Sequence, residues 1–512
     1  MSIDQSRSRG FYVYAAVLLV SGALYTFSCA PGALWQDSGL IQYRLWHNDI
    51  EGFLGLAIAH PLYYIVALGA KHFPVGEFGY RVNLVSAIAG AVAVANLYLL
   101  VRLWLNRQFP AVIAALTLAL SHTFWRHACI AETYTLWTAL FLGELIVLLQ
   151  YSKSRRTGYL YLLGLLNGLA IAVHMLACIP LICYAALLVI LLGKRTIRAK
   201  DVGLVALLWM VGALPYEYLI VKHMIQSGDI FGALASAAFG DRWQGDVLNA
   251  GLSCRMVKEN ILFLVLNFPT PNVLLFPVGC VALYRMGRTS PVRNIVLVLM
   301  VLFFIFAFRY TVADRYAFFI PFYVIASAVV GVGVRWVRQR VCRRALVYLI
   351  GGCALLPVGV YAIVPTLAAR SNLAIGTRGD IAYRDDYAYF LQPWKTGCRG
   401  AERFAREVLE AAPPDTLIYA DTTTVAPLLY VQEVQGRRPD VKIVTGLVCS
   451  AGAPPYSQKT LEQSLGRRPV YVTSPHPGYC PEFVLGRYDL VRSGLLWRVA
   501  QPCPAAGREQ DM

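Results

Sequence analysis

Residues 11–30 read FYVYAAVLLVSGALYTFSCA, and the turn Trp35-Gln36-Asp37-Ser38-Gly39 follows a few positions later. The first stretch is apolar over the length of about 20 residues that a helix needs to cross a membrane. The second is polar and holds a carboxylate. Folding does not require an ionisable side chain at the edge of an apolar segment, so Asp37 is a candidate functional residue.

The composition of the whole chain is that of a membrane protein. Of 512 residues, 57% are hydrophobic and 15% are charged, and the mean hydropathy is +0.54, far from the balance of a soluble domain. A net charge of +17 would suggest nucleic acid as the partner of a soluble protein. Here many Lys and Arg residues lie in short loops between apolar segments, which is the pattern of cytoplasmic loops. We therefore expect contacts with membrane lipids and no nucleic-acid partner.

The apolar segments predict an α-helical polytopic membrane protein with about 11 transmembrane helices in a domain over residues 1–368. The expected spans are 11–30, 80–102, 108–125, 128–150, 157–173, 175–193, 202–221, 260–284, 294–310, 316–334 and 345–366. Pro269 and Pro271 are expected to kink or break the eighth. The basic loops then fall on one side, which places the amino terminus in the cytoplasm and the carboxyl terminus outside.

Residues 369–512 have the composition of a soluble domain. Helical spacing predicts a helix over 400–412, a second helix is expected over 425–434, and short strands are expected at 416–420, 441–445 and 469–473. These elements predict a small C-terminal α/β domain outside the membrane. Its four cysteines, Cys398, Cys449, Cys480 and Cys503, make two disulfides plausible in an oxidising compartment.

The ionisable residues of the loops and outer helix ends share one side of the predicted topology. They are Asp37, His47, Asp49, Glu51, His60, Arg81, His122, Arg126, His127, Glu132, His174, Asp241, Asp314 and Arg315. A transporter is expected to hold such groups near the bilayer midplane, whereas an enzyme acting on a lipid headgroup would hold them here. Glu144 lies deeper, and we expect it to pair with Lys153 or Arg155.

Several motifs resemble those of one family. They are Asp37-Ser38-Gly39, Ala59-His60-Pro61 and Arg81-Val82-Asn83-Leu84 within the run Trp35 to Tyr98, then Thr123-Phe124-Trp125 with Ala131-Glu132-Thr133-Tyr134, and Tyr430-Val431-Gln432-Glu433 with Gly436-Arg437-Arg438-Pro439-Asp440-Val441. They resemble the GT-C-type polytopic membrane glycosyltransferases that include animal protein O-mannosyltransferases and uncharacterised bacterial members. Leu40 stands where that family usually has Glu, and Leu62-Tyr63-Tyr64 replaces its Pro-Gly-Tyr part.

The resemblance implies a GT-C-like fold that transfers a sugar, with inversion, from a polyprenyl-phosphate donor to a hydroxyl on the outer face. We expect Asp37 to be the general base that accepts the proton of the acceptor hydroxyl. Guanidinium groups match phosphate oxygens, so Arg81 and Arg315 are the candidates for holding the departing phosphate. The other candidates for binding the donor's phosphate or sugar are His60, Arg126 and Glu132.

Several points stay open at the level of sequence. The acceptor is a protein, a lipid or another glycan, no cofactor is certain, and a divalent metal is left open. The alternatives to an enzyme are a transporter or flippase of lipid-linked sugar and a non-catalytic glycan-binding membrane protein. The expected location is a bacterial inner membrane, with the active site and the C-terminal domain in the periplasm.

Overall fold

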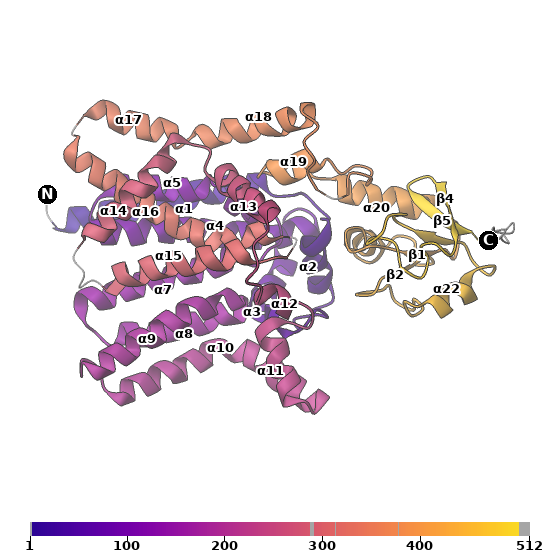
Figure 1. Cartoon of the computed structure of the whole chain (residues 1–512), viewed down its shortest axis with the longest axis horizontal. Helices are drawn as coiled ribbons and strands as arrows, with labels where there is room; N and C mark the ends of the chain where they lie inside the picture. Colours follow the sequence, from indigo (N-terminus) through magenta and orange to yellow (C-terminus); the bar gives the residue numbers. More distant parts are fainter. Residues whose placement is uncertain (1–2, 287–290, 313, 342, 377, 501–512) are drawn as a thin grey trace, which may run out of the picture.

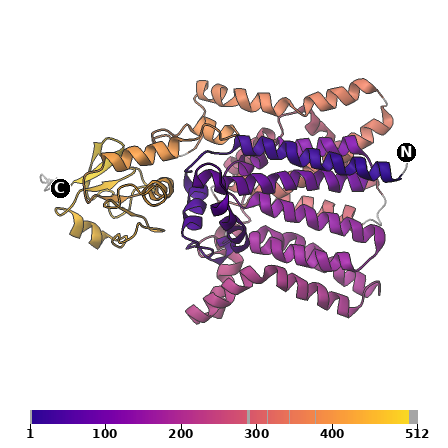
Figure 2. The same ribbon diagram turned by 180° about the vertical axis from the view of Figure 1, so that it is seen from behind.

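The structure is a computed structural model that describes residues 3–286, 291–312, 314–341, 343–376 and 378–500. Long helices lie side by side in a bundle, with the amino-terminal end of the chain at one end of it (Figures 1 and 2). A small α/β domain extends beyond the opposite end. The chain is therefore the predicted polytopic membrane protein with a C-terminal α/β domain.

Eight helical segments of the described residues are long and apolar enough to cross a membrane. They are Gly10–Ser28 of α1 (Ile3–Ser28), α4 (Phe78–Leu105), α7 (Tyr134–Ser154), Met175–Gly193 with α9 (Cys178–Gly193), α10 (Ala199–Ser227), α15 (Pro291–Arg309), Arg315–Arg340 with α16 (Ile320–Arg340), and Arg344–Arg370 with α17 (Arg344–Cys353) and α18 (Leu356–Arg370). A ninth span forms if the bent pair α13 (Cys254–Asn267) and Pro271–Arg285, which contains α14 (Leu275–Arg285), counts as one.

The bent pair confirms the predicted break, because the two helices meet at 110° around Pro269 and Pro271. Two of the eleven expected spans are shorter helices: 108–125 contains α5 (Gln108–Ala119), and 157–173 contains α8 (Gly158–Val173). Helix α5 ends early because the chain turns at residues 120–121 and starts a separate helix, α6 (His122–Ala128). By length and composition, the described residues thus supply eight or nine spans where eleven were expected.

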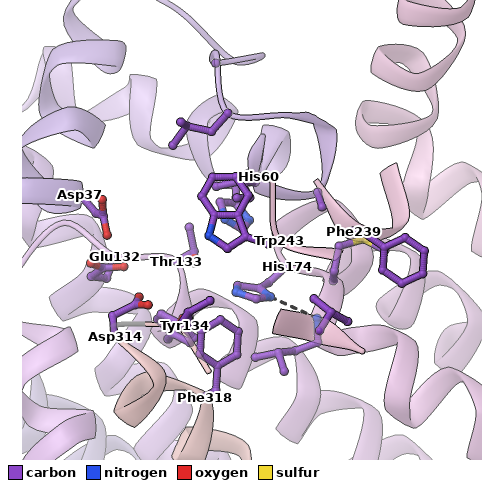
Figure 3. Close-up of a pocket in the computed structure, with 18 of the residues that line it drawn as sticks. Asp37, His60, Glu132, Thr133, Tyr134, His174, Phe239, Trp243, Asp314 and Phe318 are labelled. Carbon is purple, nitrogen blue, oxygen red and sulfur yellow. Dashed lines mark hydrogen bonds between the residues drawn. The ribbon is translucent and has the colours of Figure 1, made fainter. Parts of the chain in front are cut away.

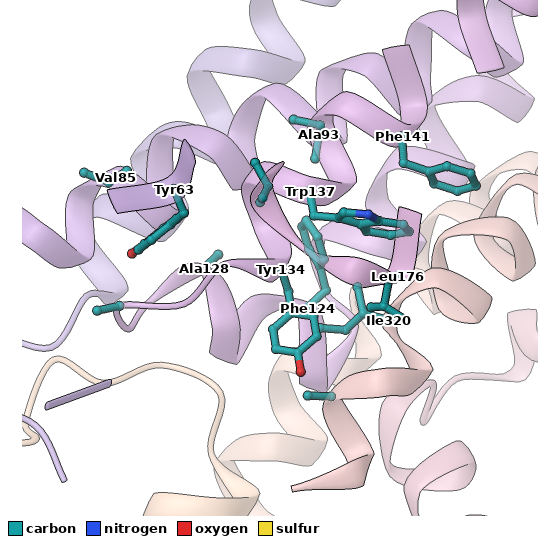
Figure 4. Packing of buried hydrophobic residues seen from close by; sticks show 14 of the residues in the cluster. Tyr63, Val85, Ala93, Phe124, Ala128, Tyr134, Trp137, Phe141, Leu176 and Ile320 are labelled. Atoms are coloured by element: carbon teal, nitrogen blue, oxygen red, sulfur yellow. The ribbon is translucent and has the colours of Figure 1, made fainter. Parts of the chain in front are cut away.

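Buried aromatic and aliphatic side chains pack together inside the bundle (Figure 4). Trp137 stacks on Phe141 with ring centroids 5.0 Å apart, and both rings meet the edge of Phe303. Elsewhere glycine lets helices touch: a Cβ on Gly168 of α8 would lie 2.1 Å from the Trp209 carbonyl oxygen of α10. This close packing fixes the ends of the helices that carry the polar residues.

Glu144 does not pair with Lys153 or Arg155 as expected. Its carboxyl group is fully buried and accepts hydrogen bonds from Asn167 Nδ2 at 3.2 Å and Tyr184 Oη at 3.0 Å. These partners lie on α8 and α9, so Glu144 links three helices inside the bundle.

The C-terminal domain is built around a five-stranded sheet of order β2-β1-β3-β5-β4. Strands β1 (Leu417–Tyr419), β2 (Lys442–Val444) and β3 (Val470–Val472) are parallel, while β4 (Asp489–Ser493) and β5 (Leu496–Ala500) form an antiparallel hairpin on one edge. The helices are α19 (Asp386–Leu391), α20 (Gly400–Ala411), α21 (Val425–Leu429), the short π-helix η6 (Tyr430–Val434) and α22 (Gln458–Ser464). The three predicted strands and both predicted helices are present, whereas the hairpin was not predicted.

The two disulfides expected in this domain do not both form. Cys398, Cys449 and Cys480 are free thiols, and Cys503 lies outside the described residues. Two bridges among four cysteines would require one between two of the three described residues, and none of these is paired.

Candidate functional site

Helix α2 (Gln36–Trp46) carries the candidate acid at the end of the bundle that faces the α/β domain (Figure 1). Asp37 lies in its first turn, where the amino-terminal end of a helix favours a negative charge. Residues 37, 40, 41 and 44 recur at the spacing of one helical face, and all four line the same cavity. One face of α2 is therefore a wall of the site.

The cavity has a volume of about 370 Å³ and is lined from elements far apart in the sequence. Asp37, Glu132 and Asp314 gather on one side, while Phe239 and Trp243 lie away from them (Figure 3). Phe239 ends α11 (Ile230–Phe239), and Trp243 precedes α12 (Gln244–Val247), so the connection after α10 contributes an aromatic wall. The cavity thus joins a carboxylate cluster to an apolar surface.

Two serines fix the position of Glu132. Ser38 Oγ on α2 donates to Glu132 Oε1 at 3.2 Å. Ser86 Oγ on α4 accepts from the Glu132 backbone N–H and donates to its carbonyl oxygen, both at 3.0 Å. The turn before α7 is therefore tied to α2 and α4, which bring Glu132 beside Asp37.

Burial of the acidic cluster disfavours full ionisation. It is the main cause that raises the pKa of Glu132 to about 8, and the charges of Asp37 and Asp314 add to it, while Arg126 and the Ser38 hydrogen bond oppose it. Burial and the charge of Asp37 raise the pKa of Asp314 to about 7, and burial raises the pKa of Asp37 as well. The three carboxyl groups therefore share protons near neutral pH.

His60 lies in the cavity as a neutral imidazole. Burial, followed by the charge of Arg44, lowers the pKa of His60 to about 4. Its Nδ1 is 2.8 Å from the Val173 carbonyl oxygen, so Nδ1 carries the proton and Nε2 is left as an acceptor. The His174 ring lies 4.8 Å away and also lines the cavity. A neutral His60 is suited to accept from a sugar hydroxyl and not to neutralise a phosphate.

Arg44 is the one Arg or Lys among the described residues that line the cavity. Its guanidinium packs 3.8 Å from the centroid of the Tyr64 ring, Nη2 donates to the Ala59 carbonyl oxygen at 3.2 Å, and Nε is 3.3 Å from Asp49 Oδ2. Gly52 makes room for this group, because a Cβ there would lie 2.7 Å from the Arg44 Cζ. The sequence analysis missed Arg44, although its spacing of seven from Asp37 is a signal for the same helix face.

The three arginines expected at the site do not line the cavity. Arg81 Nη1 donates to the carbonyl oxygens of Lys71 and Phe73 at 3.0 and 3.3 Å. Arg315 bonds to Glu259, while its neighbour Asp314, which was named among the outer ionisable residues but given no role at the site, lines the cavity. Arg126 is buried among the rings of Tyr316, Tyr389 and Phe390, and its charge opposes the rise in the pKa of Glu132.

A metal would need ligands that converge. Across the described ranges, no three His, Cys, Asp or Glu side chains lie close enough together to hold a metal ion. The described residues therefore do not identify ligands for the divalent metal that the sequence left open.

Comparison with known families and sequences supports the resemblance. Residues 54–197 match the family of the protein O-mannosyl-transferase TMEM260 N-terminal domain. Protein O-mannosyl-transferase TMEM260 of Mus musculus is 28% identical over 186 residues, which are 33% of this chain and 26% of the mouse protein. The chain thus spans about a quarter of the length of this curated relative. These matches confirm the resemblance that the motifs predicted.

Solved structures are similar over more of the chain. ArnT from Cupriavidus metallidurans bound to undecaprenyl phosphate has a TM-score of 0.63 and 15% identity, and the match covers 96% of this chain and 97% of that one. The archaeal oligosaccharyltransferase AglB from Archaeoglobus fulgidus has a TM-score of 0.45 and 15% identity over 83% of this chain and 64% of its own. The likeness to ArnT shows a shared fold and agrees with an integral membrane protein.

Proposed function

We propose that this chain is a membrane glycosyltransferase that moves a sugar from a polyprenyl-phosphate donor to a hydroxyl acceptor by a single inverting displacement. The observation that carries the proposal is the cavity at the outer helix ends, where Asp37 and Arg44 lie on one face of α2. One face of one helix thereby offers a base to the acceptor and a phosphate-binding cation to the donor, both in one cavity.

Asp37 is the general base of the proposed reaction. The acceptor oxygen attacks the anomeric carbon of the sugar, and its proton passes to the Asp37 carboxylate. The bond from that carbon to the phosphate oxygen breaks at the same time, and its electron pair leaves with the polyprenyl phosphate. Because phosphate is a stable anion, the leaving side needs charge stabilisation and no proton.

Arg44 is the proposed anchor for the donor phosphate. Nη2 donates to the Ala59 carbonyl oxygen and Nε lies in an ion pair with Asp49, which together orient the guanidinium, and we assign Nη1 to donate to a phosphate oxygen. Arg81 and Arg315 donate to groups outside the cavity, so we assign the role expected of them to Arg44.

The other cavity residues are suited to hold the sugar. Glu132, with a pKa of about 8, is largely protonated at neutral pH and can donate a hydrogen bond to a sugar or phosphate oxygen. His60 Nε2 can accept from a sugar hydroxyl, and Trp243 offers an aromatic face. Arg126 does not line the cavity, but its charge limits the rise in the pKa of Glu132.

The comparisons support the two substrate classes. The ArnT structure is described as bound to undecaprenyl phosphate, which supports a polyprenyl-phosphate donor, and the mouse relative is named a protein O-mannosyl-transferase, which supports a protein hydroxyl among the acceptors. We further propose that the site and the α/β domain face the periplasm of a bacterial inner membrane.

The test is sugar transfer from a panel of radiolabelled polyprenyl-phosphate sugars to membrane acceptors. Wild type is compared with Asp37→Asn and with Asp415→Asn, which removes an exposed carboxylate of the α/β domain that pairs with Arg468 and does not line the cavity. We expect donor-dependent incorporation that Asp37→Asn abolishes and Asp415→Asn keeps. Equal incorporation by wild type and Asp37→Asn would refute the assignment of the base, and no incorporation from any donor would refute the proposed activity.

A further inference from the structure

Helix α2 is held from the membrane side by a buried amide pair. Gln42 Nε2 donates to the Gly32 carbonyl oxygen at 3.1 Å and to Asn83 Oδ1 at 3.3 Å, and Asn83 Nδ2 donates to the Ala30 carbonyl oxygen at 2.9 Å. Gln42 and Asn83 have no exposed surface. These bonds fix the middle of α2 to α4, and in the first turn, which carries Asp37, the bundle adds the hydrogen bond from Ser38 to Glu132.

That first turn rests on the α/β domain. The Gln36 backbone N–H donates to the Thr423 carbonyl oxygen at 3.4 Å, and the Trp35 ring packs on Phe404 of α20 with centroids 5.5 Å apart. A Cβ on Gly39 would lie 2.7 Å from the Ala426 Cβ of α21, so backbone and methyl group are in direct contact. Figure 1 shows α2 at the end of the bundle that faces this domain.

The far end of α2 and the start of α4 meet the same domain. His47 Nε2 is 2.6 Å from Glu433 Oε2, and the Gly79 N–H of α4 donates to Tyr430 Oη at 2.9 Å. Residues of α21 and η6 therefore contact α2 near its first turn and at its C-terminal end.

Residues 421–424, the loop that contacts the first turn of α2, are held by hydrogen bonds within the α/β domain. Asp421, two residues after the end of β1, accepts from the Thr423 N–H at 2.7 Å, from Thr424 Oγ1 at 3.0 Å and from Thr473 Oγ1 at 2.9 Å. Arg378 Nη1 lies 2.7 Å from Asp421 Oδ2, and both side chains are 2% exposed. A buried, fully bonded carboxylate at the end of a strand holds residues 421–424 in one conformation, and Thr423 presents its carbonyl oxygen to α2.

We propose that the α/β domain positions the catalytic carboxylate: the loop 421–424 and α21 hold the first turn of α2 so that Asp37 faces the cavity. The expected effect on kcat rests on the proposed function. The expected effect on the conformation of α2 rests on the contacts alone. Ala426 and Thr423 are then positioning residues that touch no substrate. A shift of about 1 Å at a catalytic group is enough to lower turnover about 100-fold, so small changes at this contact should reach the chemistry.

The decisive variant is Ala426→Leu, which adds bulk where Gly39 leaves no space. We expect kcat for sugar transfer to fall about tenfold or more, with the donor KM unchanged, because Asp37 moves while Arg44 stays near its partners. Ala453→Leu is the matched enlargement, since Ala453 packs on the separate apolar cluster of the sheet and should keep kcat.

Amide hydrogen exchange over residues 36–46 tests the contact without turnover. In Ala426→Leu we expect these amides to exchange about tenfold faster or more, and in Ala453→Leu to exchange as in wild type. Unchanged exchange in Ala426→Leu, or a loss of activity that appears only as a raised donor KM, would overturn the proposal. If wild type transfers no sugar, the proposed function fails, and the exchange result still decides the role of the domain.

Discussion

Replacing Arg44 by Gln is the sharpest test of how the cavity holds its donor. Arg44 is 7% exposed, and with Nη2 and Nε engaged by Ala59 and Asp49 it has Nη1 left for the phosphate. One hydrogen bond to a charged group contributes about 1.5–3 kcal/mol, so kcat/KM for the donor should fall roughly 10- to 150-fold. The Asp49 side chain is 35% exposed, so the loss of its ion-pair partner in Arg44→Gln should lower the free energy of unfolding only slightly.

The assay is initial-rate sugar transfer over a range of donor concentrations, together with inhibition by free polyprenyl phosphate. Arg44→Gln should weaken both donor use and inhibition, because both molecules carry the phosphate. Arg81→Gln is the matched control, since Arg81 donates to the carbonyl oxygens of Lys71 and Phe73 outside the cavity. Equal values of kcat/KM and of the inhibition constant in wild type and Arg44→Gln would refute the reasoning.

Further changes give separate readouts. The rate should rise with pH as Asp37, whose pKa burial raises, loses its proton, and it should fall above about pH 8, where Glu132 loses its own. In a pH profile, Glu132→Gln should lose only the alkaline limb, and a flat wild-type profile would contradict this. Gly52→Ala should raise the donor KM in the same assay, because its Cβ would displace Arg44, and an unchanged KM would argue against the anchor. Asn83→Ala leaves buried partners without hydrogen bonds, so thermal unfolding in detergent should report a loss of about 1–3 kcal/mol, whereas an unchanged midpoint would show that the amide pair is dispensable.

The sequence alone predicted the features that depend on local pattern. Nine of the eleven expected spans correspond to segments that are long and apolar enough to cross a membrane, if the bent pair counts as one. The bend at Pro269 and Pro271 was also expected. Asp37 and Glu132 stood out because a carboxylate beside an apolar helix requires an explanation. The motif Arg81-Val82-Asn83-Leu84 was noted for its arginine, yet in the structure its asparagine bonds to α2.

The remaining features depend on which way a side chain points. Asp314 and Arg315 are adjacent, and only the fold decides that the carboxylate faces the cavity while the guanidinium faces Glu259. The partners of Glu144 lie 23 and 40 residues away in sequence, so local spacing favoured a nearby lysine or arginine instead. The support of α2 by the C-terminal domain joins residues almost 400 positions apart and has no sequence signal.

The most direct measurement of the central claim is the balance of the two products in one reaction. The donor is a polyprenyl-phosphate sugar labelled in both its lipid and its sugar. Wild-type protein should release one polyprenyl phosphate for each sugar that it transfers to an acceptor. At the same protein level, Asp37→Asn should release no polyprenyl phosphate and transfer no sugar. Labelled donor that crosses the bilayer uncleaved, or cleavage at the wild-type rate by Asp37→Asn, would contradict the account.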